Sequence, residues 1–403
     1  MPDLLRRSLL LICIVALTGC ARRPGLDAPP EPMDVELAPV SATSMGFHPS
    51  LSDSLDAIME AAVADSAAPG MSLAVGRYGR LVHFRGYGRI DWAEDAPDVT
   101  VRTLYDLASL TKVVATTTAA MILEEEGRLD LNAPVCEYLR GFDAPDKAFI
   151  TPYMLLAHVS GMTTRMLYRE AQGREEYLKA INEYPLQSAP GTEMSYSDWN
   201  MIIMQLVIEQ ITGTTLDAFL QERVWEPLTM RDTGFLPDPA LLARTAPTEI
   251  QEWRGGMVHG VVHDENAWGL GGVAGHAGLF SSARDLAVFV QMLLNGGSYG
   301  DVQILQPETV ARWTSRQTLG SSRALGWDTP SGRSSAGDHF SAWSFGHTGF
   351  TGTSLWMDPR QNLFVVLLSN HVNPTRGSSK IFTVRRQVAD AVQEAVLAPA
   401  YGK

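Results

Sequence analysis

Apolar positions near the two ends of the chain follow the periods of strands and flanking helices. A period near 3.6 indicates an amphipathic helix, and short apolar runs around a glycine or proline turn indicate a β-hairpin. The expected elements are a helix over Leu51–Ala64, strands over Met71–Tyr78, Leu81–Tyr87, Ser354–Asp358 and Leu363–Ser369, and a closing helix over Val384–Leu397. The pattern therefore predicts one hairpin near each end of the chain.

The middle of the chain carries helical spacing instead. The expected helices lie over Val113–Glu126, Pro152–His158, Asp198–Ile211, Leu216–Val224 and Ser282–Leu294. Ser282, with Asp285 three residues later, has the form of a capping box at the start of the last helix. The simplest arrangement is an α/β (α+β) fold. Strands from both chain ends form one antiparallel sheet flanked by helices, and a mostly helical insertion occupies about residues 104–295.

The first residues differ from the rest of the chain. Arg6 and Arg7 precede an apolar run, Ser8–Leu17, that is too short for a stable transmembrane helix. Leu17-Thr18-Gly19-Cys20 resembles a bacterial lipobox, which implies cleavage before Cys20 and lipidation of its sulfur; the alternative is an ordinary secretory signal. We expect a signal peptide over residues 1–19, a Pro-rich tether over 20–48 and a globular domain over 49–398. The protein would then be an exported lipoprotein, held by lipid on the periplasmic side of a membrane.

Composition and charge narrow the classes of partner. The chain has 403 residues, 19% of them charged, which is ordinary for a globular protein. Its net charge of −13 makes a nucleic-acid backbone an unsuitable partner. Cys136 is the one cysteine of the expected globular domain. An intrachain disulfide and a cysteine-based metal site are therefore excluded there.

One serine is followed three residues later by a lysine, in Ser109-Leu110-Thr111-Lys112. Residues three apart share a helix face, so Lys112 could take the proton of a nucleophilic Ser109. The small, apolar run that follows predicts a buried helix, and we expect burial and the helix N-terminus to lower the pKa of Lys112. The spacing occurs by chance about once in such a chain. However, only Lys112 of the five lysines has a serine at that position.

Two further stretches carry candidate groups. Tyr196 lies in a loop before the expected helix Asp198–Ile211, where it could shuttle a proton if a neighbouring cation lowered its pKa. The segment Phe345–Thr353 is rich in glycine, so its backbone could approach a ligand or pair with an extended substrate. The alternative for this segment is a tight turn.

In chain order, Ser109–Lys112 (SLTK), Tyr196–Asp198 (YSD) and His347–Gly349 (HTG) resemble the motifs of the serine penicillin-recognising enzymes. These are the class C β-lactamases, D,D-peptidases and family VIII esterases, and the motifs look most like the penicillin-binding-protein 4B type. The resemblance covers roughly residues 50–397. It implies an acylated Ser109, Lys112 as proton acceptor and Tyr196 as the group that protonates the leaving group and later activates water. It also implies an oxyanion site between the backbone N–H groups of Ser109 and Phe350, and no cofactor. The implied substrate-binding residues are Asp198, His347, Thr348, Gly349 and Phe350.

Two positions depart from the family pattern. The family usually has Asn where this chain has Asp198, and Lys where it has His347. A histidine is mostly neutral above a pKa of ~6.5, so it does not supply a permanent cation for a substrate carboxylate. We expect Asp198 to approach His347 and to raise its pKa.

Several functions are compatible with this pattern. The leading hypothesis is a serine acyl hydrolase that acts on peptidoglycan-type peptide amides, followed by an esterase and then a β-lactamase. A non-catalytic, penicillin-binding lipoprotein is the reading from a different class. A metal site at His259 and His263, four residues apart, is disfavoured because glycines break that segment.

Overall fold

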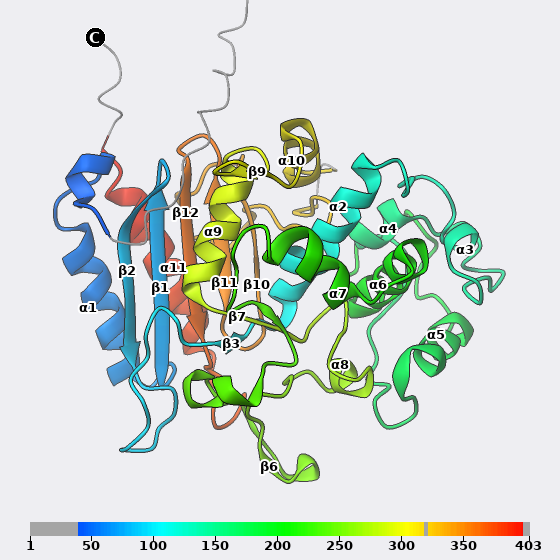
Figure 1. The fold of residues 1–403 in the computed structure, drawn as a ribbon, viewed down its shortest axis with the longest axis horizontal. Coiled ribbons are helices and arrows are strands. Elements are labelled where there is room, and N and C mark those ends of the chain that lie inside the picture. The colour runs from blue at the N-terminus through cyan, green and yellow to red at the C-terminus, as the bar shows by residue number, and fades with distance from the viewer. Residues whose placement is uncertain (1–38, 318–320, 398–403) are drawn as a thin grey trace, which may run out of the picture.

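One antiparallel sheet brings the two ends of the chain together (Figure 1). The structure is a computed structural model that describes residues 39–317 and 321–397. In that part the sheet has the strand order β10-β11-β12-β1-β2. The bounds are Gly70–Arg77 (β1), Arg80–Gly88 (β2), Phe345–Thr348 (β10), Ser354–Asp358 (β11) and Leu363–Ser369 (β12). The α/β fold and both hairpins are confirmed, and β10 is an additional strand at one edge.

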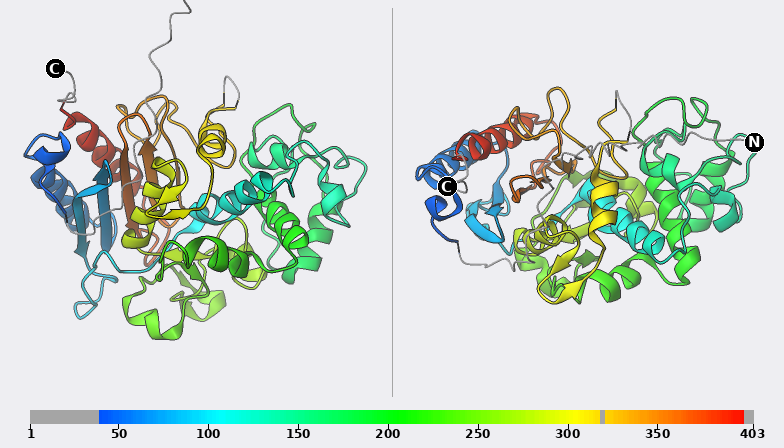
Figure 2. Two further views of the ribbon diagram at one scale, coloured as in Figure 1. Left: turned by 45° about the horizontal axis from the view of Figure 1, so that its top comes forward. Right: turned by 90° about the horizontal axis from the view of Figure 1, so that it is seen from above.

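Helices cover both faces of this sheet (Figure 2). Helices α1 (Leu51–Ala64) and α11 (Lys380–Glu394) contact each other, and α9 (Ala283–Leu294) packs on β1, β11 and β12. Successive side chains of a strand point to opposite faces, so a sheet buried on both sides has nearly continuous apolar strands. In β12, Leu363, Val365 and Leu367 join the cluster that contains α1 and α11 residues, whereas Phe364, Val366 and Leu368 join the cluster that contains α9 residues.

The helical region lies beside the β10 edge of the sheet (Figure 1). Its helices are α2 (Thr118–Glu125), α3 (Val135–Tyr138), α4 (Pro152–Leu156), α5 (Gly173–Glu183), α6 (Asp198–Thr212), α7 (Leu216–Leu220), α8 (Glu265–Gly269) and α10 (Pro307–Thr314). The same region holds a small three-stranded sheet in the order β3 (Tyr105–Asp106), β7 (Leu279–Ser281) and β4 (Gly234–Phe235). Two further pairs of short strands are β5 (Ile250–Gln251) with β6 (Gly256–Met257), and β8 (Ser298–Tyr299) with β9 (Val302–Gln303). The cluster of buried apolar side chains under α9 extends into this region, so the two parts share a core.

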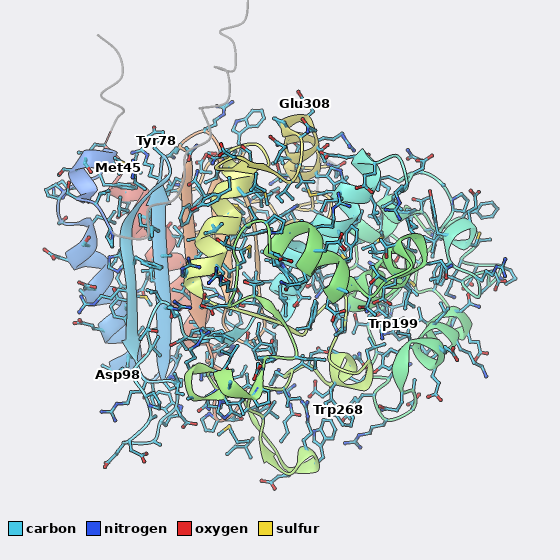
Figure 3. The ribbon with its side chains drawn as sticks, viewed as in Figure 1. Met45, Tyr78, Asp98, Trp199, Trp268 and Glu308 are labelled. Carbon is cyan, nitrogen blue, oxygen red and sulfur yellow. The ribbon has the colours of Figure 1, made fainter. Side chains whose placement is uncertain are left out.

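Side chains from the two parts fill the space between the ribbons. Figure 3 labels Trp199 and Trp268 in the helical region, and Met45 and Tyr78 at the far end of the sheet. Trp199 on α6 is buried in the shared core, whereas Trp268 on α8 remains partly exposed. Among the described residues, no helix has the length and apolar character needed to cross a membrane.

The predicted boundary between tether and domain, at residue 48, lies too late. Phe47 is fully buried and forms a β-bridge with Val396, and the Val40 N–H donates to the Leu81 carbonyl at 2.7 Å. The aromatic ring of Phe47 belongs to the cluster between α1, α11 and the sheet, which explains why this part of the expected tether is packed. Cys20, the predicted lipidation site, lies outside the described residues.

Two helices begin at other residues than the sequence pattern predicts, whereas the start of α1 agrees with it. The α1 bounds agree with the expected ones, and Ser282 Oγ accepts the Asp285 N–H at 3.3 Å as the capping box predicts. The closing helix α11 begins at Lys380, four residues before the expected start. The expected helix over Val113–Glu126 is instead a π-helical turn, Lys112–Thr117, that leads into α2.

Candidate active site

Ser109 lies on a short 3₁₀ turn, Ala108–Leu110, between β3 and the π-helical turn that starts at Lys112. Ala108, directly before it, has a φ of 47°, a left-handed conformation that is unfavourable for a residue with a side chain. The buried Asp106 carboxylate stabilises this turn because its Oδ1 accepts the Ala108 N–H at 2.8 Å. Its Oδ2 accepts the His263 N–H at 2.6 Å. Asp106 thus connects the Ser109 turn to the loop before α8.

Lys112 contacts Ser109 as the spacing predicts. Its Nζ donates to Ser109 Oγ at 2.8 Å and to the His276 carbonyl at 3.2 Å, and its side chain is fully buried. The third partner of Nζ is Asp198 Oδ1, at 2.7 Å. The ammonium group is therefore surrounded by oxygen atoms, one of them charged.

The expected direction of the Lys112 pKa shift is wrong. Burial by itself lowers the pKa of this lysine, but the nearby Asp198 carboxylate and the Tyr196 side chain together raise it above its ordinary value. The sequence indicated the burial but not the carboxylate that compensates for it.

The expected pairing of Asp198 with His347 is also wrong. Asp198 turns to Lys112, whereas His347 Nε2 lies 3.2 Å from Nη1 of Arg323. Since a guanidinium can only donate, Nε2 is the acceptor, and His347 Nδ1 donates to the Thr348 carbonyl at 2.8 Å. Burial, followed by the charges of Arg323 and Lys112, holds the pKa of His347 well below its ordinary value. The imidazole is neutral at neutral pH.

The ring of Tyr196 lies close to two cations, Lys112 and Arg323. Lys112 Nζ lies 4.9 Å and Arg323 Cζ 4.8 Å from the centre of its ring. The rings of His158 and His347 lie 4.6 Å and 5.9 Å away, centre to centre. Burial and neighbouring cations lower the pKa of His158 well below its usual value, so its Nδ1 can accept the N–H of the residue after Tyr196. Tyr196 therefore lies beside two cations and two neutral imidazoles.

The turn after β10 packs directly against the Ser109 turn. Thr351 Oγ1 donates to the Asp106 carbonyl at 2.6 Å, and Thr353 Oγ1 donates to the Leu107 carbonyl at 2.9 Å. A Cβ on Gly349 would lie 2.3 Å from the Leu107 carbonyl oxygen, so only glycine allows this approach. Within the described residues, the Phe350 N–H has no hydrogen-bond acceptor. That N–H remains available to a ligand beside Ser109.

The sequence that builds this site matches a known family. The Beta-lactamase family model matches residues 55–390. The chain belongs to the Beta-lactamase family. A relative from Salmonella paratyphi B that carries the name D-alanyl-D-alanine carboxypeptidase is 36% identical over 318 residues, which are 70% of this chain and 72% of the relative. A relative from Salmonella typhi with the same name gives the same values. The chain is therefore a serine hydrolase of this family.

Solved structures agree with this chain in fold. The Pseudomonas syringae protein titled beta-lactamase/D-alanine carboxypeptidase is 19% identical, with a TM-score of 0.70 over 85% of this chain and 99% of that one. EstCE1, titled a hydrolase with promiscuous acyltransferase activity, is 23% identical, with a TM-score of 0.70 over 85% of this chain and 98% of that one. At these identities the likeness shows the Beta-lactamase fold alone.

Sequence reasoning missed two residues of the site in this Beta-lactamase family member. Arg323 follows no motif and reaches His347 only through the fold, and Asp106 stands in the sequence as one acidic residue among many. The histidines once considered as metal ligands have other partners. His259 Nε2 lies 2.8 Å from the Thr245 carbonyl, and His263 Nε2 lies 3.0 Å from Glu249 Oε2. Among the described residues, no group of three or more ligating side chains could hold a metal ion.

A cavity of about 120 Å³ opens beside Arg323. Its lining is mainly apolar, with the arginine as the charged group. The lining residues are Tyr153, Met154, Ala157, Val159, Gly191, Gln317, Ser321 and Arg323. The same guanidinium therefore borders this cavity, His347 and the Tyr196 ring.

Proposed function

We propose that this serine hydrolase releases the C-terminal residue of cell-wall-type peptides through an acyl-enzyme on Ser109, as a D,D-carboxypeptidase does. Ser109 Oγ attacks the scissile carbonyl while the neutral form of Lys112, whose Nζ lies 2.8 Å from Oγ, accepts the proton of the hydroxyl. Asp198 stabilises the ammonium that forms, and the backbone N–H groups of Ser109 and Phe350 bind the oxyanion. Tyr196 passes a proton to the leaving amine and later activates the water that hydrolyses the acyl-enzyme.

Arg323 is the observation that carries the peptide assignment. A carboxypeptidase must bind the free carboxylate at the end of its substrate, and the neutral His347 supplies no charge for this purpose. Arg323 does, because a guanidinium stays charged and can bind a carboxylate through two parallel hydrogen bonds. The carboxylate of Asp328 lies 4.0 Å from Nε of Arg323. Among the described residues, no carboxylate therefore neutralises the two terminal nitrogens of this guanidinium at close range.

The apolar cavity beside Arg323 supports the same substrate class. A small side chain next to a carboxylate, such as that of a terminal alanine, combines an apolar group with a negative charge. The mainly apolar lining and the guanidinium at its border match these two features. The Salmonella relatives that carry a D-alanyl-D-alanine carboxypeptidase name point to the same class.

The proposal is tested by turnover of four probes with the purified protein. The probes are a stem peptide ending in D-Ala-D-Ala, its C-terminal amide, p-nitrophenyl butyrate and nitrocefin, and Ser109→Ala is the control in each case. We expect the free-carboxylate peptide to have the highest kcat/KM and Ser109→Ala to abolish turnover. Faster turnover of nitrocefin would indicate a β-lactamase. A wild type that hydrolyses none of the probes and forms no adduct with a fluorescent penicillin or a fluorophosphonate would refute the enzymatic proposal.

An esterase is the second candidate, and one observation favours it. His347 stands where the family usually has a lysine, and it is neutral at neutral pH. An uncharged substrate such as an ester makes no use of a cation at that position. Higher kcat/KM for p-nitrophenyl butyrate than for the peptide, with no change in Arg323→Met, would favour this candidate over the carboxypeptidase.

We also propose that lipid on Cys20 holds the enzyme at the periplasmic side of a bacterial membrane. The lipobox-like Leu17-Thr18-Gly19-Cys20 supports this, and such an anchor would keep the enzyme beside peptidoglycan. Metabolic labelling with a radioactive fatty acid should mark the wild type and not Cys20→Ala. Equal labelling of the two proteins, or none in the wild type, would contradict the anchor.

A further inference from the structure

Arg385 is a buried arginine of the C-terminal helix α11 that reaches the turn after β10. Its Nη2 donates to the carbonyl of Gly349 at 2.7 Å and to that of Thr353 at 2.8 Å. Its Nε donates to the carbonyl of Gly352 at 3.3 Å. All three acceptors belong to the turn that carries Phe350, so one side chain holds most of this turn.

Within the part of the chain that the structure describes, only backbone carbonyls accept hydrogen bonds from the Arg385 guanidinium. Among the described residues, no carboxylate oxygen lies within 4.0 Å of Arg385, although its side chain is buried. A buried charge without a counter-ion is costly, and backbone carbonyls compensate for it only in part. Burial lowers the pKa of Arg385 to about 9, which leaves the group charged at neutral pH. A positive charge therefore lies behind the turn without being neutralised.

The geometry of one peptide group connects Arg385 to the site. The Gly349 carbonyl and the Phe350 N–H belong to the same planar peptide unit, and in a trans peptide they point in opposite directions. Because the carbonyl is fixed on Arg385, the N–H is directed away from α11. A charge-assisted hydrogen bond to the carbonyl also polarises the amide and makes its N–H a stronger donor.

Other contacts of the turn hold it in the same orientation. His371 Nε2 lies 2.8 Å from the Phe350 carbonyl, and the Thr351 and Thr353 hydroxyls bind the backbone next to Ser109. Arg385 thus holds the turn from the side of α11, and the threonines hold it against the Ser109 turn. The two backbone N–H groups expected to bind the oxyanion lie on segments that are tied together in this way.

We propose that Arg385 is the positioning residue of the oxyanion site. It fixes the Gly349–Phe350 peptide so that the Phe350 N–H faces the reacting carbonyl, and its charge stabilises the negative oxygen that develops in the transition state. The inference rests on acylation of Ser109 as proposed above. It adds a function for α11, a helix that holds none of the residues assigned above to proton transfer or substrate binding.

The test compares three variants of the full-length protein. Arg385→Met keeps much of the side-chain volume without the charge, and Arg385→Lys keeps the charge without the planar guanidinium fork. Arg386→Met is the matched control. Arg386 is the next residue of α11, and its guanidinium binds the Ser334 carbonyl and Asp338 instead. The first assay is the kcat for p-nitrophenyl acetate hydrolysis per active site, with the active sites counted by titration with a fluorophosphonate. The second is inhibition by phenylboronic acid, whose adduct with a serine carries a tetrahedral oxyanion.

Arg385→Met should lower kcat by about 10-fold to 100-fold with KM within about two-fold of wild type, since loss of an entire oxyanion donor costs about 10²-fold to 10³-fold. The affinity for the boronic acid should fall by a similar factor. Arg385→Lys should recover part of both losses, and Arg386→Met should match the wild type. A purely structural role would change thermal stability and the number of titratable sites but not kcat per site.

The inference is wrong if Arg385→Met folds and retains kcat per site and boronic acid affinity within two-fold of wild type. If Arg385→Met does not fold, Arg385→Lys decides, because the loss of the fork should lower kcat and boronic acid affinity together by several-fold. Unchanged values in that variant would overturn the inference. A wild type that forms no fluorophosphonate adduct would instead refute the proposed function.

Discussion

Two segments border Ser109, and the buried cation of each has a different kind of partner. The helical wall is the π-helical turn that starts at Lys112 together with the start of α6, and the opposite wall is the turn after β10. On the helical wall, Lys112 forms an ion pair with Asp198 at 2.7 Å, and this carboxylate contributes to the raised pKa of the lysine. On the wall formed by the turn after β10, Arg385 binds carbonyl groups and, within residues 39–317 and 321–397, no carboxylate, and burial lowers its pKa. Ser109 lies between these walls.

The different partners of the two cations suit them to different tasks, proton transfer for the lysine and a constant positive charge for the arginine. A lysine beside a carboxylate can gain or lose a proton next to the serine, and the carboxylate stabilises the protonated form. A guanidinium keeps its proton at neutral pH, so its field stays constant through the reaction. The helical wall is therefore suited to proton transfer, and the opposite wall to stabilisation of a developing negative charge.

The largest expected effect comes from removal of the proton acceptor. We expect Lys112→Met to lower kcat/KM by about 10²-fold to 10⁴-fold, the usual contribution of a positioned base. The measurement is the rate of Ser109 acylation by a fluorophosphonate together with steady-state hydrolysis.

Lys147→Met is the matched control for this variant. Lys147 is also buried and ion-paired, with Asp146 at 3.1 Å, but it lies in the helical region and contacts the Tyr184 carbonyl. It should lose stability without losing kcat. Wild-type acylation in Lys112→Met would contradict the assignment of proton transfer to the helical wall.

The next effect concerns Arg323, the cation beside His347 and Tyr196. Arg323→Met should raise KM for a D-Ala-D-Ala peptide by roughly 10-fold to 100-fold, because a hydrogen bond to a charged group contributes about 1.5–3 kcal/mol. The C-terminal amide of the same peptide should be hardly affected. Arg316→Met is the control, since Arg316 binds Thr329 and not the site. Equal losses for acid and amide would show that Arg323 does not bind the carboxylate.

A smaller change should follow from breaking the ion pair on the helical wall. Asp198→Asn restores the residue that the family usually has and removes one cause of the raised Lys112 pKa. A neutral lysine is then populated at lower pH, so the ascending limb of the kcat/KM profile should move to lower pH. Activity at pH 7 should change by several-fold. The limb should stay in place in Asp328→Asn, whose carboxylate lies beside Arg323 instead.

The smallest effect is on stability at acidic pH. His347 has a folded-state pKa well below that of the unfolded chain, ~6.5, so below that pH only the unfolded state binds its proton. Stability should therefore fall as pH decreases, and His347→Asn should reduce the loss between pH 7 and 5.5 by up to about 1 kcal/mol. Urea denaturation at the two pH values measures this. The exposed His48→Asn should leave the loss unchanged.

Much of the fold follows from local pattern. The short apolar runs of β1, β2, β11 and β12 and the helical period of α1 were readable because each depends on neighbours a few residues apart. The bounds of strand β10 were not predicted, since its four residues include one glycine and two polar side chains; the segment was expected only to approach a ligand or pair with an extended substrate, with a tight turn as the alternative. Phe47 was placed in a tether because proline-rich sequence precedes it, although its ring belongs to the core.

The sequence alone determined that Ser109 and Lys112 share a helical face, because three residues of helix bring two side chains together whatever surrounds them. Tertiary structure decided the charge state of the site. Asp198 reaches Lys112 from 86 positions away, Arg323 reaches His347 across 24, and Arg385 reaches Gly349 across 36. A pKa depends on burial and on every charge within a few ångströms, and only packing brings such distant groups into contact.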